Sequence, residues 1–239
     1  MKKSDIGLLL IFLLLFLPFI LNASLLSFYN DMNKEHGLIM SFIKFAVLAT
    51  LGEIIGYRIK TGGYQLSGFG ILPRALVWGV LGLSIKAAFS IFSTGVPAFL
   101  VYCGLTDSVT SMLPGASITG VKIFTAFSIS VVLNVLFAPL MMTFHKITDA
   151  QIEIYHGSWI SIFKKPDFRK LLFSINWDVH YGFVLMKSIP FFWIPAHTIT
   201  FLLPPQHQVL FAALLGIMLG VILSVAAVNG RKKSTNPSF

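Results

Sequence analysis

Long apolar runs, separated by short polar segments, dominate this chain. About six of them reach the roughly 20 residues that a helix needs to cross about 30 Å of hydrocarbon. They cover approximately 6–28, 37–57, 75–102, 118–144, 179–203 and 209–228. The pattern therefore predicts an all-α polytopic transmembrane helical bundle of about six spans.

The first run follows Lys2 and Lys3 and in that respect is like a secretory signal. Its apolar stretch is longer than a signal usually has, and it lacks a convincing cleavage site, so we expect a retained helix over 6–28. No composition change divides the remainder. We expect a single integral membrane domain over 1–239 that ends in a basic tail at 229–239.

Basic residues are distributed very unevenly between the two sides that the runs define. Cytoplasmic loops are enriched in Lys and Arg, so this distribution tests the assignment of spans. Of the 18 Lys and Arg, thirteen fall on one side: Lys2, Lys3, Arg58, Lys60, Arg74, Lys146, Lys164, Lys165, Arg169, Lys170, Arg231, Lys232 and Lys233. The other side receives only Lys34, and four lysines lie within runs. Both chain ends are expected on the positive side.

Between the fourth and fifth runs, the segment 149–178 combines bulky apolar side chains with Lys164, Lys165, Arg169 and Lys170, and Pro166 interrupts it. Such a mixture is typical of helices that lie in the headgroup region. We therefore expect one or two short interfacial helices here. A plain connecting loop is the alternative.

The composition supports a membrane location, with 56% hydrophobic residues, 11% charged residues and a mean hydropathy of +0.82. A net charge of +9 in a soluble protein would suggest nucleic acid as a partner. Here the charges flank apolar runs, so we expect anionic membrane lipids as partners and no nucleic acid. The lone Cys103 excludes an intramolecular disulfide.

Small residues and prolines occur within the runs. Gly52-x-x-x-Gly56 and Gly216-x-x-x-Gly220 predict close approach between helices. Prolines within the runs remove helical hydrogen bonds and predict kinks at Pro97, Pro139, Pro190 and Pro195. The helix faces that carry these glycines would also allow two copies of the chain to associate, so a homo-oligomer stays an alternative.

Four lysines, Lys44, Lys86, Lys122 and Lys187, lie inside apolar runs. Charges at such positions are costly and usually face a bundle interior or a water-filled path. Lys86 is near the middle of its run and cannot easily reach the interface, so we expect it to face an internal cavity. Lys44 and Lys122 are close enough to span ends to reach the interface instead.

A basic lining attracts anions and penalises cations, so these lysines predict a conduit or pocket for anionic solutes. The alternative is that they only lock the bundle through contacts with carbonyl groups. Glu53 is the only acidic residue inside the runs, and we expect it to pair with Lys187 or with Arg58. Asn134 and His197 are further polar candidates for a solute path.

No spacing typical of a metal site or a catalytic nucleophile occurs among the histidines, and no glycine-rich phosphate loop follows a strand pattern. The sequence therefore argues against an enzyme, a metal and a cofactor. A membrane enzyme would need histidines that act as acid or base together with a carboxylate in one cavity. The candidates for that alternative are His180, His197 and His207.

Several segments carry landmark residues in a recognisable order. They are Gly52-Glu53 within Leu48–Gly56, Arg74-Ala-Leu at the head of the third run, Trp193-Ile-Pro195-Ala196, Phe201-Leu-Leu-Pro204 and Val221-Ile-Leu223-Ser224. Together with Lys122 at the start of the fourth run, they resemble the landmarks of the Mpv-seventeen family. That family comprises inner-mitochondrial and peroxisomal membrane proteins with bacterial relatives. The resemblance covers about 38–224, the family-like core.

Members of that family are reported to form pores for small metabolites. The resemblance therefore implies a channel and draws attention to Glu53, Arg74, Lys122 and Trp193. We expect a membrane channel or transporter for small, anionic metabolites, in a bacterial inner membrane or, in a eukaryote, the mitochondrial inner or peroxisomal membrane. The alternative is a non-transporting structural or assembly protein that acts through helix contacts.

Overall fold

The computed structural model describes residues 3–234, and within this range the chain is helical without any strand. The helices are α1 (Lys3–Leu21), α2 (Ala23–Glu35), α3 (Gly37–Thr61), α4 (Ile71–Tyr102), α5 (Ser108–Ser111), α6 (Gly120–Leu136), α7 (Ala138–Ile154), the 3₁₀ helix η1 (Trp159–Ile162), α8 (Phe168–Ser174), α9 (Trp177–Val179), the π-helix η2 (His180–Trp193), α10 (Ile194–Leu202) and α11 (Pro205–Ser234). The all-α prediction is confirmed. The tail expected at 229–239 begins inside α11, and 235–239 lie outside the described residues.

Three of the described helices are long and apolar enough to cross a membrane, namely α3, α4 and the stretch Pro205–Ile222 of α11. The number rises to five if two bent pairs, one in α1 and α2 and one in α6 and α7, each form one span. Apolar helices of this kind are compatible with an integral membrane protein.

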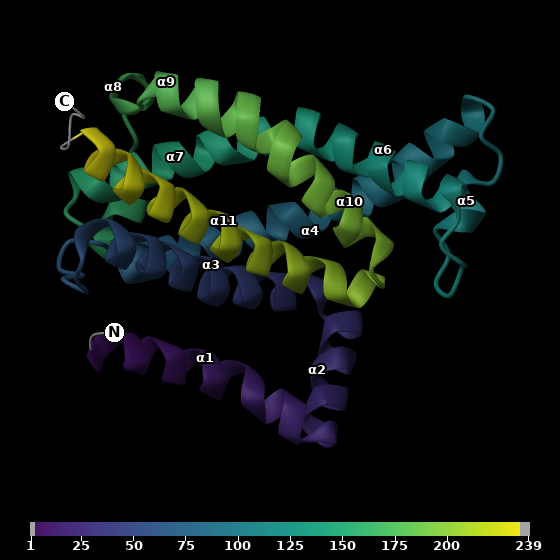
Figure 1. Ribbon diagram of the computed structural model, residues 1–239, viewed down its shortest axis with the longest axis horizontal. Coiled ribbons are helices and arrows are strands. Elements are labelled where there is room, and N and C mark those ends of the chain that lie inside the picture. Colours follow the sequence, from purple (N-terminus) through teal and green to yellow (C-terminus); the bar gives the residue numbers. More distant parts are fainter. Residues whose placement is uncertain (1–2, 235–239) are drawn as a thin grey trace.

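The expectation of one continuous helix over 6–28 is wrong. The chain bends by 99° between α1 and α2. Asn22 occupies the bend, and its side-chain Oδ1 accepts a hydrogen bond from the Leu25 N–H at 3.1 Å, which caps α2. A capping side chain can therefore end a helix inside an apolar run. α1 lies along the outside of the bundle (Figure 1), where Phe12, Leu15 and Phe16 pack against the core.

The fourth run also bends, by 42° between α6 and α7. Pro139 lies in the first turn of α7, where the missing N–H is tolerated, so the kink expected there is found. Pro97 behaves differently, because α4 continues through it to Tyr102. α7 ends at Ile154, well beyond the boundary expected near 144, and this extension brings Asp149 into a helix.

Helix α3 packs against both α4 and α11. Gly52 permits the approach of α11, because a Cβ there would lie 3.1 Å from Ile217 Cα, and a Cβ on Gly56 would lie 3.0 Å from Ser224 Oγ. The packing role expected for Gly52 and Gly56 is confirmed. The same expectation is wrong for Gly216, whose Cβ would meet open space.

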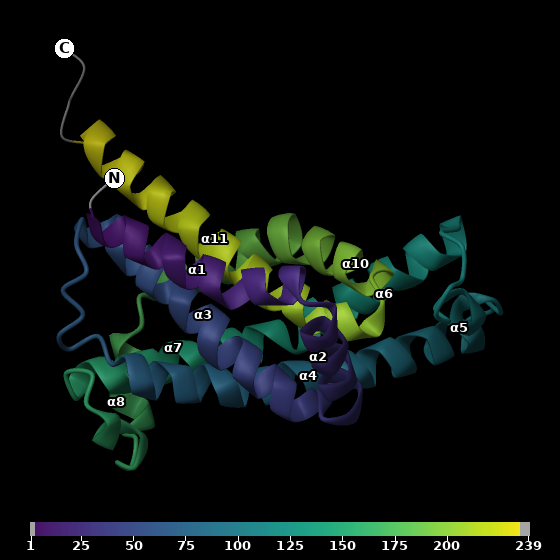
Figure 2. The same ribbon diagram turned by 90° about the horizontal axis from the view of Figure 1, so that it is seen from below.

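The two ends of the bundle differ in the segments that they gather. α1 begins, α3 ends, α4 begins and α11 ends at one end, together with α8 (Figure 1). We call this the basic end, because Lys164, Lys165, Arg169 and Lys170 lie there. α3 and α11 begin toward the opposite end, past which the second half of α4, α5 and the start of α6 extend as an arm (Figures 1 and 2).

Two turns pack closely at the basic end. Gly68 and Gly70 precede α4, Gly157 follows α7, and all three have positive φ angles. A Cβ on Gly157 would lie only 2.5 Å from the carbonyl oxygen of Gly68 and from the N atom of Gly70. Direct backbone contact therefore joins the start of α4 to the end of α7.

We expect Gly157→Ala to lower the free energy of unfolding by about 2–4 kcal/mol, because it combines a left-handed backbone with a steric clash. Gly115→Ala is the matched control, since Gly115 has a φ of 81° and open space around it. It should lose only about 1 kcal/mol. Equal losses, measured by unfolding in detergent, would contradict the close packing of the two turns.

Candidate functional site

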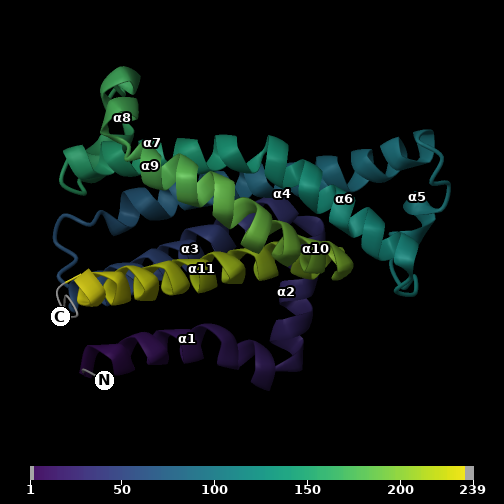
Figure 3. The same cartoon turned by 45° about the horizontal axis from the view of Figure 1, so that its top comes forward.

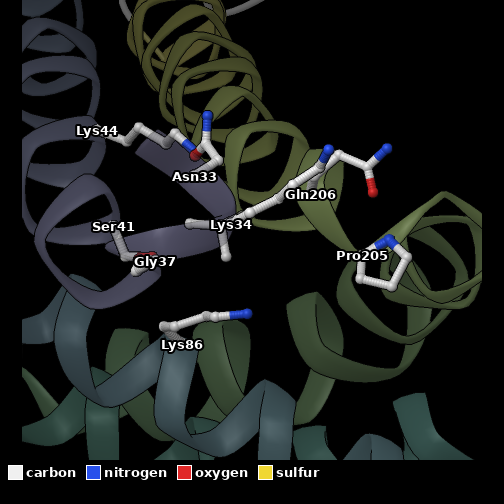
Figure 4. A pocket seen from close by; sticks show the side chains of 9 residues that line it. Asn33, Lys34, Gly37, Ser41, Lys44, Lys86, Pro205 and Gln206 are labelled. Atoms are coloured by element: carbon white, nitrogen blue, oxygen red, sulfur yellow. Dashed lines mark hydrogen bonds between the residues drawn. The ribbon is translucent and has the colours of Figure 1, made fainter. Parts of the chain in front are cut away.

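A cavity of about 210 Å³ lies where α2, α3, α4 and α11 meet, toward the end opposite the basic end. It is lined by Asn33, Lys34, Gly37, Ser41, Lys44, Lys86, Pro205, Gln206 and Val209. Three of these residues are lysines and none is acidic. Figure 4 shows the lysine side chains around the same space. Lys34 comes from α2, Lys44 from α3 and Lys86 from α4. We call this the lysine cavity.

The three lysines are held differently. Lys44 is 7% exposed, and its ammonium group donates to Asn33 Oδ1 and lies 5.2 Å from the centre of the Tyr29 ring. Lys86 is half-buried and has no acceptor within residues 3–234, and its charge repels that of Lys44. Lys34 is exposed at the rim. The cavity therefore carries excess positive charge that internal partners do not neutralise.

The backbone adds to this positive character. α3 begins at Gly37 and α11 at Pro205, and both residues line the cavity. The N-terminus of a helix carries a partial positive charge and free N–H groups, and it favours anions. No side chain caps the start of α3. Two helix ends and three lysines thus converge on one space.

The other two lysines of the apolar runs lie elsewhere. Lys122 is buried, and its ammonium group donates to the Ala116 carbonyl oxygen at 2.7 Å, which secures the loop before α6. Lys187 is exposed on η2. The structure therefore brings together two of the four lysines, Lys44 and Lys86, and adds Lys34.

Near the basic end, α3, α4 and α7 bury a cluster of charged side chains. We call it the Arg74 cluster, and its members are Glu53, Arg74, Trp78, His145 and Asp149. Arg74 and Trp78 are four residues apart on α4, as are His145 and Asp149 on α7, so each pair projects from one helix face. Glu53 projects toward them from α3.

Arg74 is at the centre of the cluster and is only 7% exposed. Its Nη1 donates to Glu53 Oε2 at 2.8 Å and to Asp149 Oδ1. Its Nε donates to the Phe69 carbonyl oxygen at 2.8 Å, and its guanidinium lies over the Phe69 ring. A buried guanidinium with several acceptors stabilises the arrangement of the helices that supply them.

The remaining contacts of the cluster are made to the other carboxylate oxygen of Glu53. Trp78 Nε1 donates to Glu53 Oε1 at 2.8 Å, and His145 Nε2 lies 3.1 Å from the same oxygen. Glu53, His145 and Asp149 are close enough together to form a metal site. The Arg74 guanidinium, however, already serves as the cation for both carboxylates. The geometry is that of an internal ion-pair network that joins three helices.

Glu53 was expected to pair with Lys187 or Arg58, and the Lys187 pairing is wrong because the carboxylate binds Arg74 and His145. The charge count placed Arg74 among the loop charges, although the family resemblance drew attention to both Glu53 and Arg74. Asp149 was missed because the fourth run was ended near 144. One signal was present. His145, Asp149 and Glu153 recur every four residues, which places all three on one face if the helix continues.

The other predicted polar residues form a separate buried contact between α6 and α10. Asn134 Nδ2 lies 3.0 Å from His197 Nδ1 and donates to the Ser130 carbonyl oxygen. The Trp193 ring lies 5.1 Å from the His197 ring. His180 instead contacts Thr143, and His207 lies in the first turn of α11. Among the side chains that the structure describes, no carboxylate contacts any of the three histidines considered as acid or base.

Packed apolar side chains separate the lysine cavity from the Arg74 cluster. Lys44 and Glu53 lie nine residues apart on α3, about 14 Å along its axis. Between them lie the buried side chains of Phe45, Leu48 and Ala49, packed in one core with Ile85, Phe89 and Ala213. The structure is therefore closed between the cavity and the basic end.

Comparison with protein family models, with curated proteins and with solved structures finds no match to this chain. The resemblance to the Mpv-seventeen family therefore depends on the landmark residues alone.

Proposed function

We propose that this protein is a membrane channel or transporter for small anionic solutes, and that the lysine cavity is its solute-binding site. The convergence of Lys34, Lys44 and Lys86 around one cavity is the observation that supports the proposal most strongly. A conduit for cations would carry acidic or carbonyl groups at this position instead.

The size of the cavity favours a small solute. Its volume of about 210 Å³ is below the range of roughly 300–1,000 Å³ that drug-sized ligands occupy. Carboxylates and phosphates suit the available donors, which are the ammonium groups, the Gln206 side-chain amide and the N–H groups at the start of α3. The proposed substrate class is therefore small metabolites with one or two anionic groups.

The arrangement of the chain fits this function if six segments cross the membrane. These would be α1, α3, α4, the bent pair α6 and α7, η2 with α10, and α11. The basic end would then face the cytoplasm, as the positive-inside rule requires. The lysine cavity would take up solute from the opposite side. The packed core and the Arg74 cluster would keep the basic end closed until the helices rearrange.

Flux through proteoliposomes tests the proposal. We expect purified protein to pass small mono- and dicarboxylates or inorganic phosphate faster than ammonium-type cations of similar size, and we expect Lys86→Gln to lower the anion-to-cation ratio. Lys187→Gln is the matched control, because it removes a lysine from an apolar run outside the cavity. Protein that passes no small solute would favour the structural alternative, and selectivity unchanged by Lys86→Gln would remove the role of the cavity.

A further inference from the structure

A second, larger cavity lies at the basic end and differs in character from the lysine cavity. Its volume is about 310 Å³, and it runs between α4, α7 and the segment 161–168. Leu76 and Val80 of α4 and Phe144 and Ile147 of α7 form apolar walls, and Lys164 lies at the segment that covers it. We call this space the α4–α7 groove.

The segment that covers the groove is fixed to α7. Gln151 Nε2 donates to the carbonyl oxygens of Ser161 and Lys164, at 3.2 and 3.3 Å. Beyond this attachment, α8 projects away from α7 to the side of the bundle (Figure 3). The groove therefore has one wall formed by the helices α4 and α7, and another formed by the end of η1 and the irregular chain that leads to α8.

The chain that follows the groove is strongly positive, and Lys164 itself lines the groove. Lys164, Lys165, Arg169 and Lys170 are all exposed. The only acid among them is Asp167, whose carboxylate accepts the Lys170 N–H and caps α8. Exposed aromatic side chains accompany them, with Trp159 60% and Phe163 68% exposed. Basic and aromatic side chains together are typical of the headgroup region of a bilayer.

We propose that the α4–α7 groove binds one acyl chain of an anionic phospholipid, while Lys164 and its basic neighbours contact the headgroup phosphate. An apolar groove with Lys164 in its lining, followed along the chain by three further exposed cations, matches the two parts of such a lipid. The short helices would thereby be anchored to the membrane through one specific lipid as well as through general contact with the surface. This proposal does not depend on solute transport.

Lipid binding to the full-length protein in detergent, counted by native mass spectrometry, tests the proposal. Phosphatidylglycerol should bind at least about fivefold more tightly than phosphatidylcholine, and Lys164→Gln should weaken phosphatidylglycerol binding about fivefold, the effect of one basic residue near a membrane surface. Val80→Trp, which fills the groove, should weaken it by roughly tenfold or more. Glycerol phosphate, the headgroup without chains, should not compete at the same concentrations.

Two substitutions outside the groove serve as matched controls. Lys60→Gln removes an exposed lysine at the same end of the bundle, and Val47→Trp enlarges an exposed valine on α3. Both should retain wild-type binding. Equal binding of the two phospholipids, competition by glycerol phosphate, or unchanged binding in either Lys164→Gln or Val80→Trp would each overturn the proposal.

Discussion

Replacing Arg74 with glutamine is expected to lower the free energy of unfolding by about 3–5 kcal/mol, the usual cost of removing one partner from a buried ion pair. The substitution leaves the carboxylates of Glu53 and Asp149 buried and facing each other without the guanidinium that lies between them. Because the three partners come from α3, α4 and α7, the loss should also loosen the basic end. Unfolding in detergent, followed by circular dichroism, measures the change.

The same cluster offers an internal control. The double variant Arg74→Gln/Asp149→Asn should recover part of the lost stability. It removes the Asp149 carboxylate charge together with the guanidinium that neutralises it, so fewer unpaired charges remain buried. Lys60→Gln removes an exposed cation from the same end and should change stability by less than about 0.5 kcal/mol. An Arg74→Gln variant as stable as Lys60→Gln would contradict the structural role of the cluster.

Reversing the charge of Lys86 is expected to have the largest effect on solute selectivity. At about 6 Å and an effective dielectric constant of about 40, one charge contributes about 1.4 kcal/mol to the binding of a unit anion. Lys86→Glu changes the local charge by two, so the apparent affinity for a monovalent anion should fall by roughly a hundredfold. Cation flux should rise, because the cavity would then carry a carboxylate beside Lys44.

Concentration-dependent uptake into proteoliposomes measures both effects. Lys187→Glu makes the same change of charge on an exposed residue of η2 and should leave anion uptake near the wild-type level. If both variants lost anion uptake equally, the effect would come from the overall charge of the protein and not from the lysine cavity.

The helical class and most helix positions followed from hydropathy alone, since a chain that crosses hydrocarbon must satisfy its backbone hydrogen bonds internally. Where helices end was harder to predict. The bend at Asn22 depends on one capping side chain, and the extension of α7 to Ile154 places Asp149 and Glu153 on a helix although both are charged. Hydropathy is averaged over many residues, so it does not detect a helix end that one side chain determines.

The candidate sites were predicted in part. Depth within a run drew attention to Lys86, which lines the lysine cavity. It wrongly set Lys44 apart as a residue that could reach the interface, because Lys44 lines the same cavity and is only 7% exposed. Lys34 was assigned to a loop, and only the fold of α2 against α3 and α11 places it at the cavity rim. The pairing of Glu53 with Arg74 likewise depends on how α3, α4 and α7 pack, which periodicity within each helix does not determine.

The central claim is that the lysine cavity attracts anions, and charge-selective labelling tests it most directly. A single thiol is introduced by Gln206→Cys, with the exposed Cys103 replaced by serine. The reaction rates of an anionic and a cationic methanethiosulfonate reagent are then compared, each corrected by its rate with a free thiol. Because of the three lysines, we expect the anionic reagent to react at least about tenfold faster than the cationic one. Lys86→Gln should lower this ratio of anionic to cationic reaction rates. Equal rates, or faster labelling by the cationic reagent, would contradict the account.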